Sequence, residues 1–157
     1  MSTRARIGII QPQGTVRSIY THWGGAPTDH GPILLTHYAS PSRVLDLLEL
    51  GNLSVLGPEI GSRHGFDLHA VDDRFARWCL AYGRDRGDPH EHALVDASVE
   101  FFVETCRICR ADYAYLWTTE RWIGCAIPAA PIAPIWMPLS DLMGFSCKKR
   151  FHCGGAA

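Results

Sequence analysis

Two stretches near the start of the chain have the patterns of β-strands: the first is a short β-branched run, and the second alternates with a two-residue period. Residues 6–10 (Arg-Ile-Gly-Ile-Ile) and 16–23 (Val-Arg-Ser-Ile-Tyr-Thr-His-Trp) flank Gln-Pro-Gln-Gly at 11–14, a run typical of turns. In the second stretch the even-numbered side chains share one face and the odd-numbered ones share the other. The pattern predicts a β-hairpin over residues 6–23.

Two short helices are expected after this hairpin. Asp29 is placed to cap the first, which covers residues 29–38. The second has a stronger start signal, because Ser40 is a good cap and Pro41 then occupies the first helical position, where no amide hydrogen is needed. Gly51 is placed to end this second helix.

The second half of the chain combines helical and strand patterns. Residues 96–110 carry apolar side chains at helical spacing, although residues 99–103 alone also fit a strand. Residues 77–82 form a third strand candidate. Residues 112–117 and 121–127 predict a second hairpin.

The remaining segments read as connections. Residues 52–60 are rich in glycine, residues 61–74 are polar and read as an exposed loop, and residues 83–89 form a charged turn. Residues 144–157 read as a loosely ordered C-terminal tail. Hairpins and clustered helices without regular βαβ alternation predict the α+β class: one domain over residues 1–143, with an antiparallel β-sheet decorated with short helices.

Composition narrows the range of partners. The 157 residues are 46% hydrophobic and 20% charged, and 15 basic residues against 16 acidic ones give a net charge of −1. Proteins that hold phosphate backbones nonspecifically carry a basic surplus, so a nucleic-acid polymer is not the expected partner. The balance still permits a local pocket for a small anion.

Neither a membrane span nor a secretion signal is expected. The longest apolar run, residues 123–137, is interrupted by three prolines, and the N-terminus enters directly into the first strand. These features predict a protein that stays in the compartment where it is made, and whose six cysteines stay free thiols.

Zinc binding is a side hypothesis. Cys106 and Cys109 have ligand spacing, and Cys147, His152 and Cys153 could complete a tetrahedral site. The competing interpretation is that Cys106 and Cys109 are plain apolar residues of a helical stripe.

The densest candidate for ligand chemistry is Arg84-Asp85-Arg86-Gly87-Asp88. In an extended segment, side chains two residues apart point the same way, so Arg84 and Arg86 could converge on a diphosphate. The alternative is a solvated turn in which Asp85 and Asp88 neutralise the two arginines.

Aromatic side chains form the second candidate feature. Trp23, Tyr82, Tyr115 and Trp117 fall on or beside predicted strands, and a row of rings can stack nucleobases. Aromatic residues in strands also serve as core or cross-strand pairs, so both interpretations stay open.

Catalytic signatures are missing from the sequence. It contains no GxSxG, HExxH, GxxxxGK[ST] or GxGxxG motif. We therefore expect neither an enzyme nor a cofactor.

Several motifs resemble a family of small phage and prophage proteins. They are Arg6-Ile-Gly-Ile, Gly14-Thr-Val-Arg-Ser-Ile-Tyr-Thr-His-Trp, Ala81-Tyr-Gly-Arg-Asp-Arg-Gly-Asp and Asp112-Tyr-Ala-Tyr-Leu-Trp-Thr. This family is in turn similar to the phage nucleotide sponges of the Thoeris anti-defence type. The resemblance implies a decorated antiparallel sheet, assembly into dimers or hexamers, and capture of a cyclic ADP-ribose isomer or cyclic oligonucleotide without cleavage.

The residues and the resemblance together favour a non-enzymatic phage anti-defence protein that sequesters a small nucleotide signal in the cytoplasm of a bacterial host. We expect Arg84 and Arg86 to hold phosphate, Tyr82, Tyr115 and Trp117 (or Trp23) to clamp a base, and His22 to contact ribose or phosphate. One alternative is a protein–protein inhibitor of a host defence enzyme. Another is a small enzyme that degrades a nucleotide signal.

Overall fold

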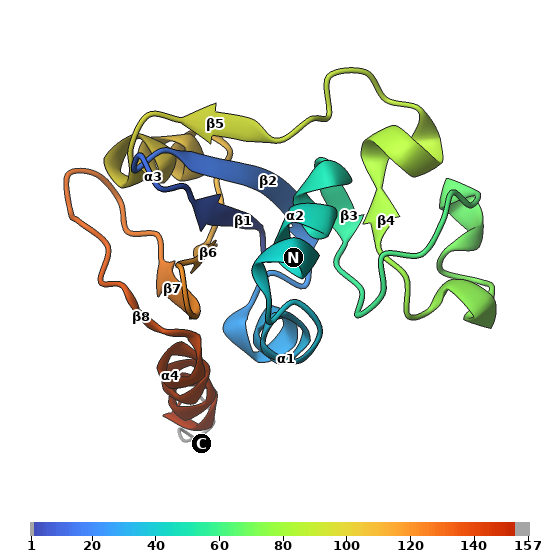
Figure 1. The fold of residues 1–157 in the computed structure, drawn as a ribbon. Coiled ribbons are helices and arrows are strands. Elements are labelled where there is room, and N and C mark those ends of the chain that lie inside the picture. Colours follow the sequence, from blue (N-terminus) through green and yellow to red (C-terminus); the bar gives the residue numbers. More distant parts are fainter. Residues whose placement is uncertain (1, 153–157) are drawn as a thin grey trace.

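The computed structural model describes residues 2–152 of the chain, and the side chains of residues 2–145. It has eight strands and four α-helices in the described range (Figure 1). The strands are β1 (Ala5–Ile10), β2 (Val16–Trp23), β3 (Leu53–Val55), β4 (Leu80–Ala81), β5 (Leu94–Asp96), β6 (Tyr113–Trp117), β7 (Trp122–Ala126) and β8 (Met137–Pro138). The helices are α1 (Pro27–His37), α2 (Pro41–Glu49), α3 (Val99–Ile108) and α4 (Leu139–His152), with short turns η1 (Phe66–Leu68), η2 (Asp73–Phe75) and η3 (Tyr82–Arg86).

One mostly antiparallel sheet organises the molecule, as the α+β prediction requires. Its strand order is β4-β3-β2-β1-β6-β7-β8, and β5 pairs with β2 outside this path. Both predicted hairpins, β1–β2 and β6–β7, are confirmed. The sheet is not purely antiparallel, because β1 pairs parallel with β6 and β2 pairs parallel with β3.

Helices cover both faces of the sheet (Figure 1). Helices α1, α2 and α4 pack on the face that carries Ile7, Ile19 and Tyr115, which is the larger core. Helix α3 packs on the opposite face, where Phe102 and Cys106 form a smaller core with Val16, Ala114, Leu116 and Cys125. The strand alternation seen in the sequence therefore sorts side chains between two cores.

The helix boundaries follow local capping chemistry. The Ser40 hydroxyl accepts a hydrogen bond from the Arg43 amide, and Gly51 ends this region at a φ of +72°, as predicted. The prediction that Asp29 caps α1 is wrong, because the helix already begins at Pro27 and its cap residue is Ala26. The helix predicted over residues 96–110 is confirmed for Val99–Ile108, so residues 99–103 are helical rather than extended, while Asp96 belongs to β5.

The short edge strands differ most from the sequence analysis. Strands β3 and β5 lie in segments without a strand pattern, and the predicted strand 77–82 is reduced to the two residues of β4. Strands β3 and β5 are defined by their hydrogen bonds to β2, and β4 by its hydrogen bonds to β3, more than by the types of their side chains.

At the C-terminal end of the described residues, α4 covers residues 139–152, so most of the segment expected as a tail is helical. Helix α4 packs against α1 and β7. None of the helices within residues 2–152 is both long and apolar enough to cross a membrane.

Candidate functional site

The candidate site forms where the outer edge of β2 changes partner. Strand β5 pairs with residues 16–18 of β2, and β3 pairs with Thr21 and Trp23. Between these two partners the amide of Tyr20 donates to the side chain of Asn52, with 2.8 Å between N and Oδ1. Asn52 thus replaces a strand partner at the one place where the edge is interrupted.

Asn52 also ties this edge to two other segments. Its backbone amide donates to the Glu91 carbonyl over 2.8 Å, and its carbonyl accepts from the amide of Tyr82 over 3.1 Å. Its side-chain Nδ2 donates to Glu91 Oε2 over 2.8 Å. Four hydrogen bonds at one residue therefore fix β2, η3 and the segment at Glu91 relative to one another.

A pocket of about 460 Å³ opens between these segments, beside the C-terminal end of α3. It is lined by Arg6, Tyr20, Asn52, Tyr82, Arg86, Glu91 and Cys109. This size is within the range of pockets that hold small molecules.

Arg6 is the least expected of the lining residues. It is only 2% exposed, and its Nε and Nη2 donate to the Ser18 hydroxyl over 3.1 and 2.8 Å. Nη2 also donates to the Ser18 carbonyl over 3.1 Å. Among the described residues no carboxylate pairs with Arg6, and Nη1 donates no hydrogen bond. A buried cation with neutral partners leaves a positive charge at the floor of the pocket.

Tyr20 lies opposite Arg6 across the β1–β2 ladder and on the same face. Its hydroxyl shares a hydrogen bond with His22 Nδ1, at 2.8 Å. Burial, partly offset by the charge of Arg4, raises the pKa of the Tyr20 phenol. The phenol therefore stays protonated at neutral pH and is a hydrogen-bond donor beside the Arg6 cation.

The second wall of the pocket comes from η3. Tyr82 stacks on Phe66 with 5.7 Å between ring centroids and 25° between ring planes. The guanidinium carbon of Arg86 lies 4.7 Å from the centroid of each ring. Arg86 also pairs with Asp88 at 2.6 Å, and its side chain is 49% exposed. The Arg86 cation and the Tyr82 ring thus line one side of the pocket, and Phe66, which stacks on Tyr82, lies outside the lining.

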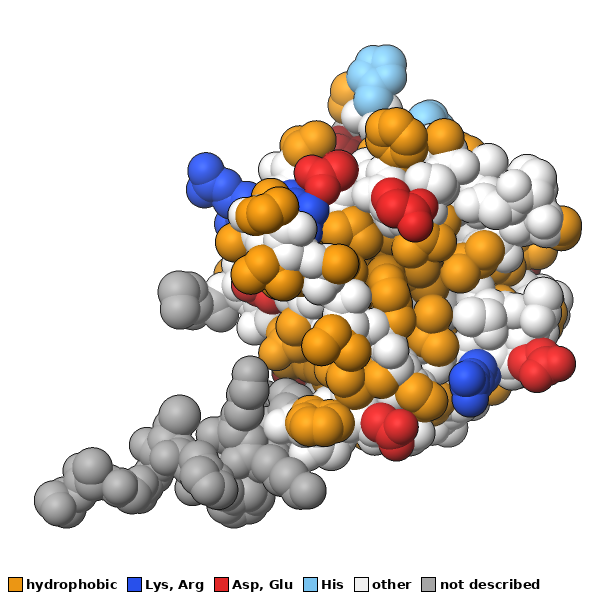
Figure 2. Space-filling view, turned by 90° about the vertical axis from the view of Figure 1, so that its left-hand side faces the viewer, with side chains coloured by type: hydrophobic (Ala, Val, Ile, Leu, Met, Phe, Trp, Pro, Cys, Tyr) orange, Lys and Arg blue, Asp and Glu red, His pale blue; other side chains and the backbone are white. Residues whose placement is uncertain are grey.

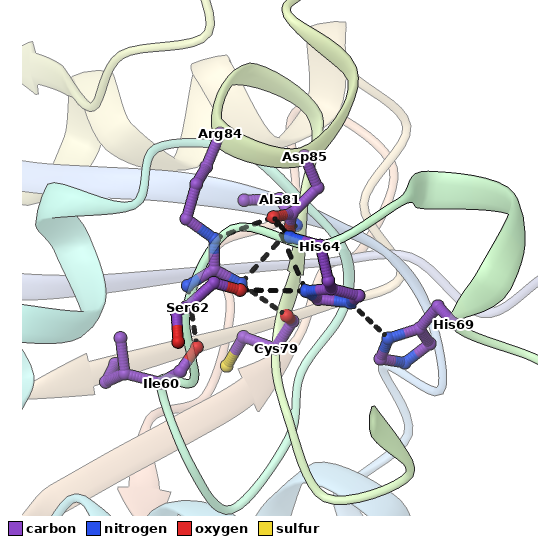
Figure 3. Close-up of polar contacts among 8 residues, drawn as sticks. All are labelled: Ile60, Ser62, His64, His69, Cys79, Ala81, Arg84 and Asp85. Carbon is purple, nitrogen blue, oxygen red and sulfur yellow. Dashed lines mark hydrogen bonds and ion pairs between the residues drawn. The ribbon is translucent and has the colours of Figure 1, made fainter. Parts of the chain in front are cut away.

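Arg84 and Arg86 do not converge as the sequence analysis predicts. That prediction assumes an extended segment, whereas residues 82–86 form a helical turn that ends at Gly87 with a φ of +80°. Arg84 does not line the pocket, and it donates to Asp85, to the Ile60 carbonyl and to the Cys79 carbonyl, each at 2.8 Å (Figure 3). Its guanidinium is engaged inside the protein, and only Arg86 of the two lines the pocket.

Asp85 organises a buried polar cluster beneath η3 (Figure 3). Its carboxylate accepts from the amides of Ala81 and His64, at 2.8 and 3.2 Å. The His64 ring lies between the Ser62 carbonyl and His69, with Nε2 of His64 2.9 Å from Nδ1 of His69. This cluster anchors the loop of residues 61–69 to η3, and through η3 it supports the wall that carries Tyr82.

The predicted aromatic residues separate into two groups. Tyr115 is fully buried and donates to the Gly25 carbonyl over 2.6 Å, while Trp117 packs edge-on against Trp122 in the larger core. Trp23 is 50% exposed and lies edge-on against His22. Of the predicted aromatic clamp, only Tyr82 lines the pocket.

The cysteine side chains in the described range give no metal site. Cys79, Cys106, Cys109 and Cys125 are free, and no group of three His, Cys, Asp or Glu side chains in this range is placed to hold a metal. Burial raises the pKa of the Cys125 thiol to about 12, so this thiol is not poised as a nucleophile. The side chains of Cys147, His152 and Cys153, the other half of the zinc hypothesis, lie outside the described residues.

Sequence reasoning missed Arg6, Tyr20, Asn52 and Glu91 as a group. One signal was available, because the hairpin pairs an arginine in an otherwise apolar strand with a serine and a tyrosine on the same face. No sequence signal links Asn52 with Glu91, since a tertiary contact 39 residues apart joins them.

Comparison of the chain with protein-family models, with curated proteins and with solved structures finds no match. The family resemblance therefore rests on the sequence motifs, and the site is interpreted from its own chemistry.

Proposed function

We propose that this protein binds and sequesters a small nucleotide signal, without cleaving it, in the pocket between β2, η3 and α3. In this role Arg6 and Arg86 bind the phosphate, and the base or sugar lies beside Tyr82 and Tyr20. A non-enzymatic role is supported by the absence of a nucleophile motif and of a phosphate loop from the sequence.

The single observation that carries the proposal is the burial of Arg6 without an acidic partner. A charge removed from water is destabilising unless an opposite charge or a set of hydrogen bonds compensates it. Ser18 occupies two of the three guanidinium nitrogens, and a bound phosphate would occupy the third. Arginine is well suited to this task because its planar fork matches phosphate oxygens.

Arg86 and the aromatic pair supply the second part of the argument. Arg86 has the exposure to exchange Asp88 for a ligand phosphate, and Tyr82 presents a ring at the pocket edge. Stacking of a base on an aromatic ring contributes about 1–3 kcal/mol. A nucleotide offers both the anion and the flat ring that this wall accommodates.

The biological setting follows from the resemblance. We propose a phage or prophage protein that acts in the bacterial cytoplasm and captures a cyclic ADP-ribose isomer or a cyclic oligonucleotide. A homo-oligomer, a dimer or a hexamer, would enclose a ligand that one open pocket leaves partly in solvent.

The test is capture and release. Purified protein is incubated with lysate that contains nucleotides made by activated TIR enzymes or cyclases, washed, heat-denatured, and the released material is identified by mass spectrometry. We expect one intact nucleotide per pocket from the wild type and none from Arg6→Met. The exposed Arg121, outside the pocket, provides the matched control, and Arg121→Met should capture as wild type does. Empty wild-type protein, or equal capture by Arg6→Met, would refute the proposal.

A second candidate function, inhibition of another protein, draws on a different surface. Figure 2 shows hydrophobic side chains gathered on the face that carries α3 and the segment before β8. Ile132 and Ile135, in the segment before β8, are 63% and 77% exposed. Apolar surface of this kind is typical of protein contacts. This function predicts no captured nucleotide and loss of inhibition when Ile132 is replaced by a polar residue.

A further inference from the structure

Glu91 lies in the same pocket as Arg6 and Arg86 but pairs with neither of them. No ion pair within 4.0 Å joins its carboxylate to any described cation. Its Oε2 instead accepts a hydrogen bond from Asn52 Nδ2 over 2.8 Å. The pocket therefore contains two positive groups and one negative group, held apart.

The position of Glu91 is fixed by its backbone as well as by its side chain. The Asn52 amide donates to the Glu91 carbonyl over 2.8 Å, and Gly51 approaches that carbonyl so closely that a Cβ there would lie 1.9 Å from the oxygen. Because main chain and carboxylate are held by the same short segment, Glu91 cannot easily swing toward Arg86. Its charge is preorganised in the way that the charge of Arg6 is preorganised by Ser18.

The separated charges of Arg6, Arg86 and Glu91 determine which chemical groups a ligand of this pocket must carry. A bare phosphate or pyrophosphate gains attraction from Arg6 and Arg86, but it also meets repulsion from Glu91. A ligand that carries a phosphate at one end and hydrogen-bond donors at the other gains from both groups, because a carboxylate accepts strongly from hydroxyl or amino groups.

We propose that Glu91 is the specificity-determining residue of the pocket, which selects nucleoside phosphates over simple phosphate anions by accepting hydrogen bonds from the ribose hydroxyls or from an amino group of the base. This inference rests on the proposed function, and it adds the chemical class of the ligand and the residue that distinguishes it. The Asn52 side chain acts as a positioning residue, because it orients the Glu91 carboxylate.

Calorimetric titration with two probes, adenosine 5′-monophosphate and pyrophosphate, tests the inference. Glu91→Gln keeps an oxygen that can accept from Asn52 but removes the charge. We expect this variant to bind the monophosphate several-fold more weakly and pyrophosphate several-fold more tightly, so that the ratio of the two affinities falls by about tenfold. Glu91→Asp keeps the charge but withdraws it by one methylene, so it should weaken the monophosphate without strengthening pyrophosphate. Glu120→Gln, at an exposed hairpin position, is the control and should change neither affinity.

Two further nucleotides identify the donor group. If 2′-deoxyadenosine 5′-monophosphate binds the wild type weakly and is insensitive to Glu91→Gln, the ribose hydroxyls are the donors. If instead inosine 5′-monophosphate, which lacks the amino group, binds the wild type weakly and is insensitive to Glu91→Gln, the amino group of the base is the donor.

The outcomes separate this inference from the proposed function. Arg6-dependent binding with both probes changed equally by Glu91→Gln would overturn the inference alone, since Glu91 would then contribute only a general field. Unchanged affinities for both probes would overturn it as well. Failure of the wild type to bind any probe in an Arg6-dependent way would overturn the proposed function, and this inference with it.

Discussion

The guanidinium of Arg84 lies against the carboxylate of its chain neighbour Asp85, with Nε 2.8 Å from Oδ1 and Nη2 3.0 Å from Oδ2 (Figure 3). The Asp85 side chain is fully buried and that of Arg84 is 17% exposed. Adjacent residues of opposite charge in a sequence normally indicate a solvated turn. Here the helical turn η3 directs both side chains into the protein, where their ion pair stabilises η3.

This pair predicts that Arg84 and Arg86 have opposite roles, although only one residue separates them. Arg84→Met leaves the Asp85 carboxylate buried without its cation, which should lower the free energy of unfolding by about 3 kcal/mol. Arg86→Met should leave the denaturation midpoint close to that of the wild type and weaken nucleotide capture. Urea denaturation and the capture experiment measure the two effects. Equal stability of the two variants would contradict the assignment.

The Asn52–Glu91 contact predicts a pH-dependent defect in Asn52→Asp. The new carboxylate still accepts from the Tyr20 amide, but an oxygen replaces the nitrogen that donates to Glu91 Oε2. We expect a loss of about 2 kcal/mol of stability at pH 7, because a hydrogen bond to a charged group becomes a repulsion. The repulsion requires both carboxylates to be charged, and a proton on either one removes it. The defect should therefore shrink as the pH falls toward 4 in urea denaturation series. A pH-independent defect would contradict the predicted like-charge contact.

Two glycines with similar backbone conformations predict different substitution effects. Gly14 and Gly51 have φ angles of +89° and +72°, but an added Cβ at Gly14 meets nothing within 4 Å, while at Gly51 it would lie 1.9 Å from the Glu91 carbonyl oxygen. Gly14→Ala should lower stability by about 1 kcal/mol, the effect of a left-handed backbone alone. Gly51→Ala should lower it considerably more and should also abolish capture, because Glu91 and Asn52 must shift. Thermal melts of both variants against the wild type provide the measurement, and equal melting temperatures would refute the close contact.

Burial of His30 predicts a stability that falls in acid. The ring is 2% exposed, its Nε2 lies 3.3 Å from the Thr21 hydroxyl, and burial lowers its pKa to about 3. The unfolded chain takes up a proton near pH 6.5, whereas the folded imidazole stays neutral, so acid favours unfolding between these two values. Below pH 6.5 the slope from this group approaches about 1.4 kcal/mol per pH unit.

His30→Gln separates this contribution from that of other groups. Relative to the wild type, its free energy of unfolding should vary less steeply between pH 6.5 and pH 4.5. The exposed Gln13, in the turn between β1 and β2, supplies the control, since Gln13→Asn changes no titratable group and should retain the wild-type slope. Parallel curves for the wild type and His30→Gln would show that His30 is not the group responsible.

Elements built from neighbouring residues could be predicted from the sequence alone. The alternation in residues 16–23 sets which side chains of β2 face each core, and Ser40 with Pro41 starts α2 through contacts within one helical turn. Such patterns are legible because chain geometry alone brings the interacting groups together. They were sufficient to predict the α+β class and both hairpins.

Which of the candidate residues form the site depends on tertiary contacts. Tyr115 and Trp117 lie in the core because helices cover their face of the sheet. Arg84 is kept out of the pocket lining by the helical turn η3, whose sequence predicts only a charged loop. Arg6 becomes a buried cation, and Asn52 meets Glu91, through pairings between segments far apart in the chain. The physical reason is that a pocket depends on the relative placement of distant segments, which no local pattern of residues encodes.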